Sequence, residues 1–427
     1  MYIIYSFLYL VALILLLPYF IYREVKSPRY IKSLKQRLGF LPVKLNPQRE
    51  PSLWIHTVSV GETIAAKPLI LQLRQRYPDV KIFLSTTTIT GHSVAEKSHY
   101  PVDGLIYFPF DFSFSCRRAL HLLKPRLLLL MEGEIWPNLL RLCKKGKVKV
   151  ILINGRISPR SYRRHRAIRA FFKRVLDNID IYCMQSQEDA KRIIDIGASE
   201  ERVFVSGNLK FDQGGFSLSE AKVEELKKLF QINQKDSVII AGSTHQGEEE
   251  IVLQAFKRLK KDYQGIKLIL APRHPERCPQ IEALLRQNQL PYIRRSELSP
   301  SSEKKKNSLF LLDTIGELSS LYSLGYIIFV GGSLVPKGGH NILEPAFLGK
   351  PVIFGHHMEN FKHIASQFLK SEAGLQVSNL QELLNSILLL LTNRQIYEKM
   401  SQNARRLVVN NRGAAQKTMK AIEELLA

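Results

Sequence analysis

The sequence is short of cysteine and of acidic side chains. Asp and Glu number 38 against 62 Lys and Arg, which leaves a formal charge of +24. Such an excess calls for an anionic partner, namely a nucleic acid, an anionic membrane or a phosphorylated substrate. The few cysteines lack Cys-x-x-Cys spacing, which argues against a zinc site or a disulfide framework and suits a reducing compartment. They are Cys116, Cys143, Cys183 and Cys278.

Charged residues are missing altogether from residues 1–22. This length is enough to span a bilayer, which takes about 20 residues, so we predict a membrane anchor there. The segment has no basic start and no small-residue cleavage site, which argues against a signal peptide. Residues 23–50 are rich in Lys and Arg and predict that the rest of the chain lies on the cytoplasmic side. The alternative is a helix lying in the membrane interface.

Apolar runs alternate with helical patterns along the rest of the 427 residues. Leu53–Val58 and Arg126–Met131 are typical of buried parallel strands, and the alternation restarts at Ser237–Ala241. We therefore predict two α/β domains of parallel strands, each Rossmann-like, with a cleft between them. The expected boundaries are 51–205 for the first domain, 206–217 for a polar linker and 218–427 for the second domain.

Carboxylates and a lysine follow the predicted strands of the first domain. Glu62 lies after a strand in a first helical turn, where the helix dipole favours an ionised carboxylate and a general base. Glu is also common in first turns for purely structural reasons. Glu132 and Glu134 end another strand beside Trp136, where buried carboxylates need partners. Lys210 is a candidate partner, although a lone linker lysine is more often simply solvated.

Small, hydroxyl and basic residues stand at successive strand ends of the second domain. Ligands of open α/β sheets bind at the carboxyl ends of the strands, so these residues together predict a nucleotide site. An arginine there can form a forked contact with a phosphate. The residues are Ser243 and Thr244, Pro272 and Arg273, and Ile315, Gly316 and Glu317.

A glycine-rich run at 329–351 follows another predicted strand and leads into a predicted helix at His340–Leu348. Glycines let the backbone approach a ligand, and the first N–H groups of the helix suit a phosphate. Asn341 and Glu344 stand three apart on one helical face, where the carboxylate suits ribose hydroxyls. A lone glycine-rich loop is a weak signal, and an ordinary α/β turn is the alternative.

A basic run covers 156–174, with eight Arg or Lys residues and no acidic one. A solvated helix face is its usual meaning. Beside a membrane anchor, an anionic lipid surface or a phosphorylated lipid is a better partner than nucleic acid. Few stacking aromatics interleave with the basic residues, which further weakens the case for nucleic acid.

Six segments together resemble one family, the 3-deoxy-D-manno-oct-2-ulosonic acid (Kdo) transferases of lipopolysaccharide biosynthesis. The resemblance covers essentially the whole chain and implies a GT-B glycosyltransferase fold. It departs from the family at Gly133, where Thr is frequent, and at Gln246, where Glu is common. The segments are HTVSVGE (56–62), MEGEIWPN (131–138), SGNLKFD (206–212), AGSTHQGEE (241–249), APRHPER (271–277) and VGGSLVPKGGHNILEPA (330–346).

The resemblance also implies roles. Glu62 matches the catalytic base, and Glu132 and Lys210 match positions that stabilise the transition state. The acceptor is expected to be lipid IVA, a lipid A precursor, at the inner membrane of a Gram-negative cell, and CMP-Kdo is the donor substrate, with no cofactor. The segments expected to contact CMP are Pro272–Arg273, Ile315–Gly316–Glu317 and the run Gly339, His340, Asn341, Ile342, Leu343 and Glu344.

The expected reaction is an inverting displacement. Arg273, backbone N–H groups and a helix dipole would stabilise the departing phosphate. The sequence has no Asp-x-Asp motif placed to hold Mg²⁺, so we expect metal independence. One alternative is another membrane-associated GT-B enzyme with a UDP-sugar donor. A second is a non-enzymatic binder of anionic membranes or nucleic acids.

Overall fold

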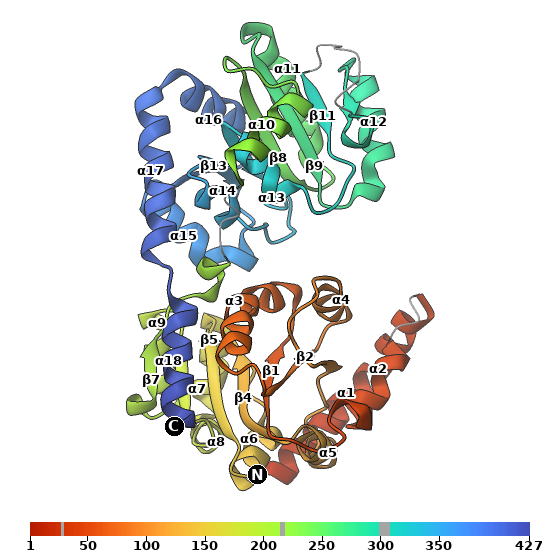
Figure 1. Cartoon of the computed structure of the whole chain (residues 1–427), viewed down its shortest axis with the longest axis vertical. Helices are drawn as coiled ribbons and strands as arrows, with labels where there is room; N and C mark the ends of the chain where they lie inside the picture. Colours follow the sequence, from red (N-terminus) through yellow and green to blue (C-terminus); the bar gives the residue numbers. More distant parts are fainter. Residues whose placement is uncertain (27–29, 214–217, 299–307) are drawn as a thin grey trace. The chain divides into compact units, whose positions relative to one another are not determined.

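The computed structural model describes residues 1–26, 30–213, 218–298 and 308–427 (Figure 1). The chain divides into two compact units. The first unit comprises Met1–Gln213 and Asn411–Ala427, and the second comprises Gly214–Asn410. Each unit is an α/β domain with its own parallel sheet, as the alternating sequence pattern predicts.

The first unit has, within its described residues, a seven-stranded sheet of order β3-β2-β1-β4-β5-β6-β7. Every neighbouring pair is parallel. This order places β1 and β4 side by side in the middle of the sheet. The strands are β1 (Ser52–Thr57), β2 (Lys81–Thr86), β3 (Gly104–Tyr107), β4 (Pro125–Met131), β5 (Lys149–Gly155), β6 (Ile181–Met184) and β7 (Val203–Val205).

Helices connect the successive strands of this sheet, as parallel connections require; the first two helices precede β1, and the last follows the second unit in the chain. They are α1 (Tyr2–Lys26), α2 (Tyr30–Arg37), α3 (Val60–Arg76), α4 (Ile89–Lys97), α5 (Ser113–Leu123), α6 (Pro137–Lys145), α7 (Pro159–Ala167), α8 (Arg169–Leu176), α9 (Gln187–Ile196) and α18 (Ala414–Leu426), with 3-10 turns η1 (Val43–Leu45), η2 (Glu200–Arg202) and η3 (Leu209–Asp212).

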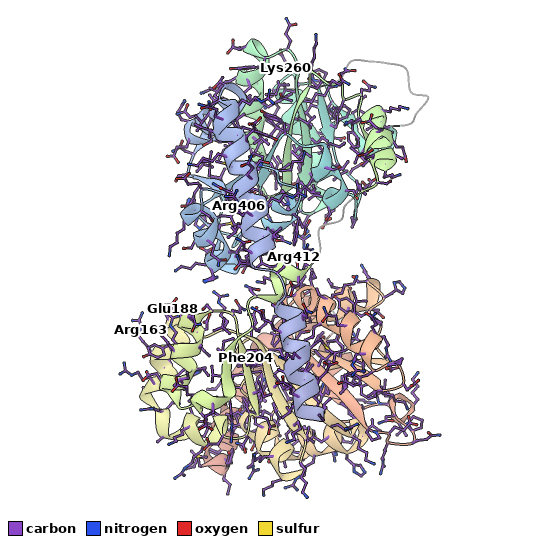
Figure 2. The ribbon with its side chains drawn as sticks, turned by 60° about the vertical axis from the view of Figure 1, so that its left-hand side comes forward. Arg163, Glu188, Phe204, Lys260, Arg406 and Arg412 are labelled. Atoms are coloured by element: carbon purple, nitrogen blue, oxygen red, sulfur yellow. The ribbon has the colours of Figure 1, made fainter. Side chains whose placement is uncertain are left out.

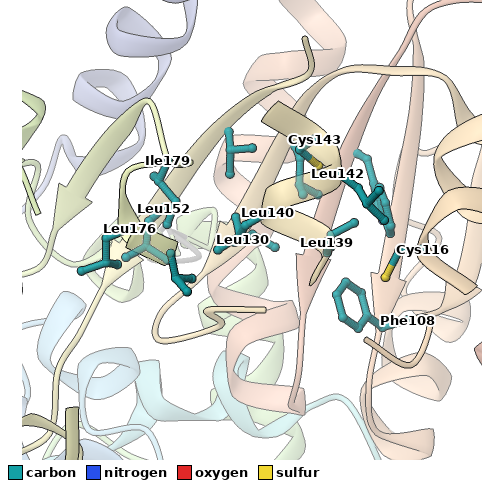
Figure 3. Packing of buried hydrophobic residues seen from close by; sticks show 14 of the residues in the cluster. Phe108, Cys116, Leu130, Leu139, Leu140, Leu142, Cys143, Leu152, Leu176 and Ile179 are labelled. Atoms are coloured by element: carbon teal, nitrogen blue, oxygen red, sulfur yellow. The ribbon is translucent and has the colours of Figure 1, made fainter. Parts of the chain in front are cut away.

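The central strands are apolar on both faces because both faces are covered. Alternate residues of β4 enter two different clusters: Leu128 and Leu130 pack on one side, and Leu127 and Leu129 on the other. Figure 3 shows the first cluster, in which Leu130 lies near residues of α6 such as Leu140. A strand buried on both faces is a continuous apolar run rather than an alternating one, which is why these strands were predictable.

The helix α18 belongs to the first unit. Asp212 fixes its start by accepting the N–H of Gly413 at 2.7 Å and that of Ala415 at 2.6 Å. Its apolar face, including Ala415 and Ile422, is buried against the first sheet. The chain returns to the first unit at Asn411. Figure 2 labels Arg406, on the helix before this point, and Arg412, just before α18.

The expected domain division therefore differs from the structure at two places. Residues 411–427 were expected in the second domain, but they cover the first sheet, because helical spacing shows an apolar face without showing which sheet it covers. The expected linker 206–217 starts inside the first unit, where Leu209 and Phe211 are buried. Residues 214–217 lie outside the described part of the chain.

The expected spanning anchor is not found. In the described residues, no helix combines the length and the apolar character needed to cross a bilayer. Residues 2–26 nevertheless form the helix α1. Many of its apolar side chains are exposed, and Ile3, Phe7 and Leu15 are each more than 60% accessible.

The second unit has, in its described part, a seven-stranded parallel sheet of order β10-β11-β9-β8-β12-β13-β14. The strands β9, β8 and β12 lie next to one another at its centre. The strands are β8 (Ser237–Thr244), β9 (Ile266–Pro272), β10 (Ile293–Arg294), β11 (Leu309–Leu311), β12 (Ile327–Val330), β13 (Val352–Gly355) and β14 (Gly374–Val377).

Its helices again connect successive strands, and α17 ends the unit. They are α10 (Glu220–Leu229), α11 (Glu248–Asp262), α12 (Cys278–Gln287), α13 (Leu318–Leu321), α14 (Leu343–Phe347), α15 (Lys362–Lys370), α16 (Leu380–Thr392) and α17 (Arg394–Asn410), with 3-10 turns η4 (Pro275–Arg277), η5 (Arg295–Glu297), η6 (Tyr322–Leu324) and η7 (Glu359–Phe361).

Candidate active site

Glu62 stands in the first turn of α3, directly after β1. Ser59 caps this helix, and its hydroxyl accepts the N–H of Glu62 at 3.4 Å. The carboxylate in turn accepts the Ser59 hydroxyl at 3.1 Å and the Val58 N–H at 2.9 Å. This reciprocal cap holds the carboxylate at the carboxyl edge of the sheet.

Two further carboxylates follow β4, the neighbour of β1. Glu132 has a left-handed backbone (φ 56°), and its N–H is bonded to the carbonyl of Ile153 at 2.9 Å. Glu134 accepts the indole N–H of Trp136 at 2.9 Å. The sheet order therefore brings the three predicted carboxylates to one edge.

Lys210 lies in the turn η3, which is anchored to the first sheet rather than solvated. The side-chain oxygen of Asn154, at the end of β5, accepts the Leu209 N–H at 2.9 Å. The side-chain oxygen of Asn208 accepts the Lys210 N–H at 3.0 Å. Glu132 and Glu62 both act electrostatically on the Lys210 ammonium group, so the structure brings together the three residues that the resemblance marks as catalytic.

The electrostatics of Glu62 differ from the expectation. A helix start was expected to hold this carboxylate ionised, but burial, followed by the charge of Glu132, raises the pKa of Glu62 to about 8. The hydrogen bond from Val58 opposes this shift, and Glu134 adds to it. Desolvation and like charge thus outweigh the helix dipole. Burial also lowers the pKa of Lys210, while the charges of Glu132 and Glu62 counter that effect.

This arrangement is chemically suited to proton abstraction. A general base is most effective when its pKa lies near the working pH. Glu62 meets that condition, and a neighbouring cation can stabilise the negative charge that develops on the attacked hydroxyl. The charge of Glu132 favours the charged form of the Lys210 ammonium group.

His56 is a residue of this edge to which sequence reasoning gave no role. It is fully buried on β1 and stacks on Phe108 with centroids 3.6 Å apart. Its Nδ1 lies 3.0 Å from the Ser85 hydroxyl and its Nε2 lies 3.7 Å from a Glu134 oxygen. Burial lowers the pKa of His56, and the Glu134 carboxylate opposes this shift. The sequence does contain a signal for a role of His56, because a polar residue directly follows the apolar residues Trp54 and Ile55 in a buried strand.

In the second unit, one buried carboxylate binds the start of the glycine-rich loop. The carboxylate of Glu248, at the start of α11, is completely buried. It accepts the N–H groups of Gly332 at 2.7 Å, Ser333 at 3.0 Å, Leu334 at 2.9 Å and His245 at 2.9 Å. A protein carboxylate therefore takes the place of an anion at these four groups.

The predicted helix at His340–Leu348 is shorter than expected. The structure has α14 over Leu343–Phe347 only, because Gly338 and Gly339 both have positive φ and hold the chain in a loop. The helix therefore begins at Leu343 rather than at His340 and ends at Phe347.

Asn341 and Glu344 do come together, as their spacing predicts. The amide of Asn341 donates to Glu344 Oε1 at 3.1 Å, and the Ser319 hydroxyl donates to Oε2 at 2.7 Å. Asn341 Oδ1 accepts the Leu343 N–H at 3.0 Å. Ile342 and Leu343 are buried and anchor this turn.

The other predicted nucleotide residues lie at neighbouring strand ends. Pro272 closes β9, and Arg273 is exposed, with its N–H bonded to the Thr244 carbonyl at 2.9 Å. Ser243 has a left-handed backbone (φ 57°). Thr244 is buried, and its hydroxyl has no hydrogen-bond partner within the described residues.

The segment before α13 is held by an ion pair. Glu317 accepts two N–H groups of Arg295, at 2.7 and 3.1 Å, and the Thr314 hydroxyl also donates to it. Ile315 is 86% exposed, and Gly316 has a φ of +95° with open space around it. An exposed apolar side chain beside an open glycine leaves room for a flat ligand group.

Comparisons with known proteins show which family this chain resembles. Residues 32–213 match the family model described as 3-Deoxy-D-manno-octulosonic-acid transferase (kdotransferase). A 3-deoxy-D-manno-octulosonic acid transferase of Haemophilus influenzae is 34% identical over 423 residues, covering 99% of this chain and 98% of that protein. A bifunctional glycosyltransferase/methyltransferase of Fusobacterium nucleatum is 37% identical over 377 residues. The match covers 86% of this chain but only 58% of that protein.

A solved structure shares the architecture. The UDP-GlcNAc 2-epimerase of Neisseria meningitidis aligns with 88% of this chain and 100% of its own, with a TM-score of 0.59. Its sequence is only 17% identical, so this likeness concerns the fold alone. It agrees with the two-sheet, GT-B-like architecture that the motifs imply.

Proposed function

Because the chain belongs to the family of 3-deoxy-D-manno-octulosonic acid (Kdo) transferases, we propose that it transfers Kdo from CMP-Kdo to lipid IVA. It is a glycosyltransferase of lipopolysaccharide biosynthesis. The observation that carries the finer proposal is the carboxylate–lysine cluster at the carboxyl edge of the first sheet.

In this proposal Glu62 is the general base. Its capped position holds the carboxylate still, and a pKa of about 8 matches the requirement to accept a proton from a hydroxyl near neutral pH. Lys210 stabilises the developing charge on the acceptor oxygen. Glu132 positions Lys210 and holds the Glu62 pKa high.

The second unit binds the nucleotide of the donor. Arg273 is exposed at the end of β9 and free to reach an anion, and the carboxylate of Glu344 suits ribose hydroxyls. The positive side chains that surround this edge would meet the charge of the departing phosphate, which supports a displacement that needs no metal bridge. Attack by the hydroxyl on the face opposite the leaving group inverts the anomeric carbon.

The acceptor is a lipid, and the first unit carries features that suit a membrane surface. The helix α1 packs one side on the unit: Tyr5 lies against Phe171, and Asn138 donates to the Ser6 hydroxyl at 2.9 Å. Its other side exposes apolar residues. Exposed arginines of α7, Arg163 and Arg166 among them, suit anionic headgroups. We propose that α1 lies in the interface of the inner membrane rather than across it.

Product analysis tests this function. The chain is incubated with CMP-Kdo and lipid IVA, and the products are identified by mass spectrometry, with UDP-sugars as alternative donors. Addition of Kdo is expected from CMP-Kdo alone. Thermal stabilisation by UDP and not by CMP would overturn the proposal in favour of a UDP-sugar enzyme.

The interfacial placement of α1 has its own test. Replacing the exposed Phe7 by Asp is expected to weaken sedimentation with vesicles that contain anionic lipid by about tenfold, since a buried aromatic contributes about 1.5–3 kcal/mol. The matched control is Phe114→Asp, at an exposed position on α5. Equal binding of the Phe7→Asp variant and the wild type would contradict this placement.

A further inference from the structure

Histidines gather where the three central strands of the second sheet end. His245 follows β8, His274 follows β9 and His340 lies in the loop after β12. The rings of His245 and His340 are parallel within 5° with centroids 5.2 Å apart, and their Nε2 atoms are 2.9 Å apart. The ring of His274 meets that of His245 edge-on at 5.8 Å. In an Nε2–Nε2 hydrogen bond one ring must accept, so that ring is neutral.

The side chains that act on this pair are cationic. Burial and these cations lower the pKa of His245 to about 4 and that of His340 to about 3. The permanently charged groups are Lys337, Arg277 and Arg273 for His245 and Arg273 for His340, while the neighbouring histidines contribute only when they are protonated.

The carboxylates of the same elements are engaged elsewhere. Glu248 accepts four backbone N–H groups, as described above. Glu249 is buried and accepts Arg277 at 2.8 Å, and Glu276 lies 3.4 Å from His274 on the exposed side of η4. Among the described residues, the charged groups that most affect the pKa values of this pair include no carboxylate, and the nearby arginine and lysine side chains would attract an arriving anion.

We propose that the His245–His340 pair binds the phosphate of the nucleotide and takes up one proton as that phosphate becomes a dianion. The inference rests on the proposed function, because CMP is the leaving group. It follows from the geometry of the loop: Glu248 has filled four backbone donors, and the imidazole pair lies at the same strand ends as Arg273 and the Thr244 hydroxyl, which has no partner within the described residues.

The proton and electron balance is simple. The acceptor oxygen forms a bond to the anomeric carbon, its proton passes to Glu62, and the bond from that carbon to the phosphate oxygen breaks with its electron pair. The phosphate thereby changes from a diester with one negative charge to a monoester with nearly two. A proton from solvent adds to the accepting ring, and each Nε2 then donates its own N–H to the phosphate, in place of the one shared N–H.

Ring nitrogen spectra of the full chain test the inference. Histidine is labelled with ¹⁵N, and the protein is titrated at pH 7 with CMP and with cytidine, which lacks the phosphate. His245→Gln and His340→Gln assign the two signals, and His121→Gln, at an exposed position on α5, is the matched control. We expect CMP to move the signals of the pair to the imidazolium range and cytidine to leave them neutral.

Calorimetry gives a second readout. His245→Gln is expected to weaken CMP binding about 10- to 100-fold, as for the loss of a charge-assisted hydrogen bond, and to leave cytidine binding unchanged. If CMP binds the wild type while both rings stay neutral, the inference is wrong and the proposed function stands. If CMP does not bind at all, the proposed function fails and the inference fails with it.

Discussion

The two units carry the same sheet architecture and oppositely charged edges. In the first unit, carboxylates crowd the ends of β1 and β4, and burial with like charge raises the pKa of Glu62 to about 8. In the second unit, cations crowd the ends of β8, β9 and β12, and burial with like charge lowers the pKa of His245 to about 4. Each unit holds a titratable group whose pKa lies far from its ordinary value.

This difference shows how one fold can host two halves of a reaction. A carboxylate with a high pKa is ready to keep a proton once it has accepted one. An uncharged imidazole pair in a positive field is ready for an anion. Both sheets are parallel and seven-stranded, and the chemical difference lies in the loop residues at the carboxyl ends of their central strands.

The largest effect is expected from removing the base. Glu62→Gln keeps the shape and the cap but cannot accept a proton, so transfer should fall about 10²- to 10⁴-fold. CMP binding should be unchanged, since Glu62 lies in the first unit. Steady-state kinetics measure the transfer rate, and calorimetry with CMP measures nucleotide binding. Full activity in this variant would remove the base role from Glu62.

The next effect concerns stability of the second unit. In the wild type the Glu248 carboxylate accepts four backbone N–H groups. Glu248→Gln replaces one of its oxygens by an NH₂ group, which cannot accept them, at a cost of about 2–4 kcal/mol in the free energy of unfolding. Denaturant unfolding measures this loss. The control is Glu250→Gln, which affects a carboxylate with a single backbone contact, to Gly247 at 3.0 Å. If both variants are equally stable, Glu248 does not hold the loop.

A smaller catalytic loss is expected at Lys210. Lys210→Ala removes the cation beside the acceptor oxygen, and kcat should fall about tenfold or more, as for the loss of one electrostatic contact in a buried site. The KM for CMP-Kdo should hardly change. Lys210→Arg, which keeps the charge, is expected to recover part of the rate. An equal loss in kcat and in donor affinity would make Lys210 a phosphate contact instead.

The smallest effect is a shift along the pH axis. The proposed base must be ionised to accept a proton, so under this proposal kcat/KM of the wild type should rise with pH and level off above about 8. Glu132→Gln removes a negative charge that raises this pKa, and the inflection should move down by about one pH unit. An inflection that stays in place would show that burial alone sets the Glu62 pKa.

The raised pKa of Glu62 also makes the free energy of unfolding depend on pH. A carboxyl group whose pKa is raised on folding destabilises the fold as the pH rises from its ordinary value of 4.5 through 8. Glu62→Gln should therefore melt above the wild type at pH 9 and near it at pH 5.

Much of the fold was predictable because its strands are buried on both faces. The expected strand at Leu53–Val58 matches β1 within a residue, and that at Arg126–Met131 matches β4. The grouping of Glu62, Glu132 and Lys210 was predictable from motif resemblance together with strand order. The pairing of Asn341 with Glu344 needed only their spacing.

Other features depend on contacts between residues far apart in sequence. The acidic start of α11 is typical of an ordinary helix N-terminus, and nothing local indicates that Glu248 reaches a loop 84 residues later. The pKa of Glu62 depends on how deeply it is buried, which the motif does not specify. The position of α18 depends on Asp212, a residue more than 200 positions earlier than the N–H groups it accepts.

That last contact has a consequence for biosynthesis. Domains generally fold as they leave the ribosome, the N-terminal one first. Here the first unit cannot bury its sheet completely until residues 414–426 have been synthesised, because α18 forms part of its core. A chain released early would carry an intact second unit beside an unfinished first one, with apolar surface open to proteases and chaperones. Synthesis of residues 414–426 is thus a condition for a stable first unit.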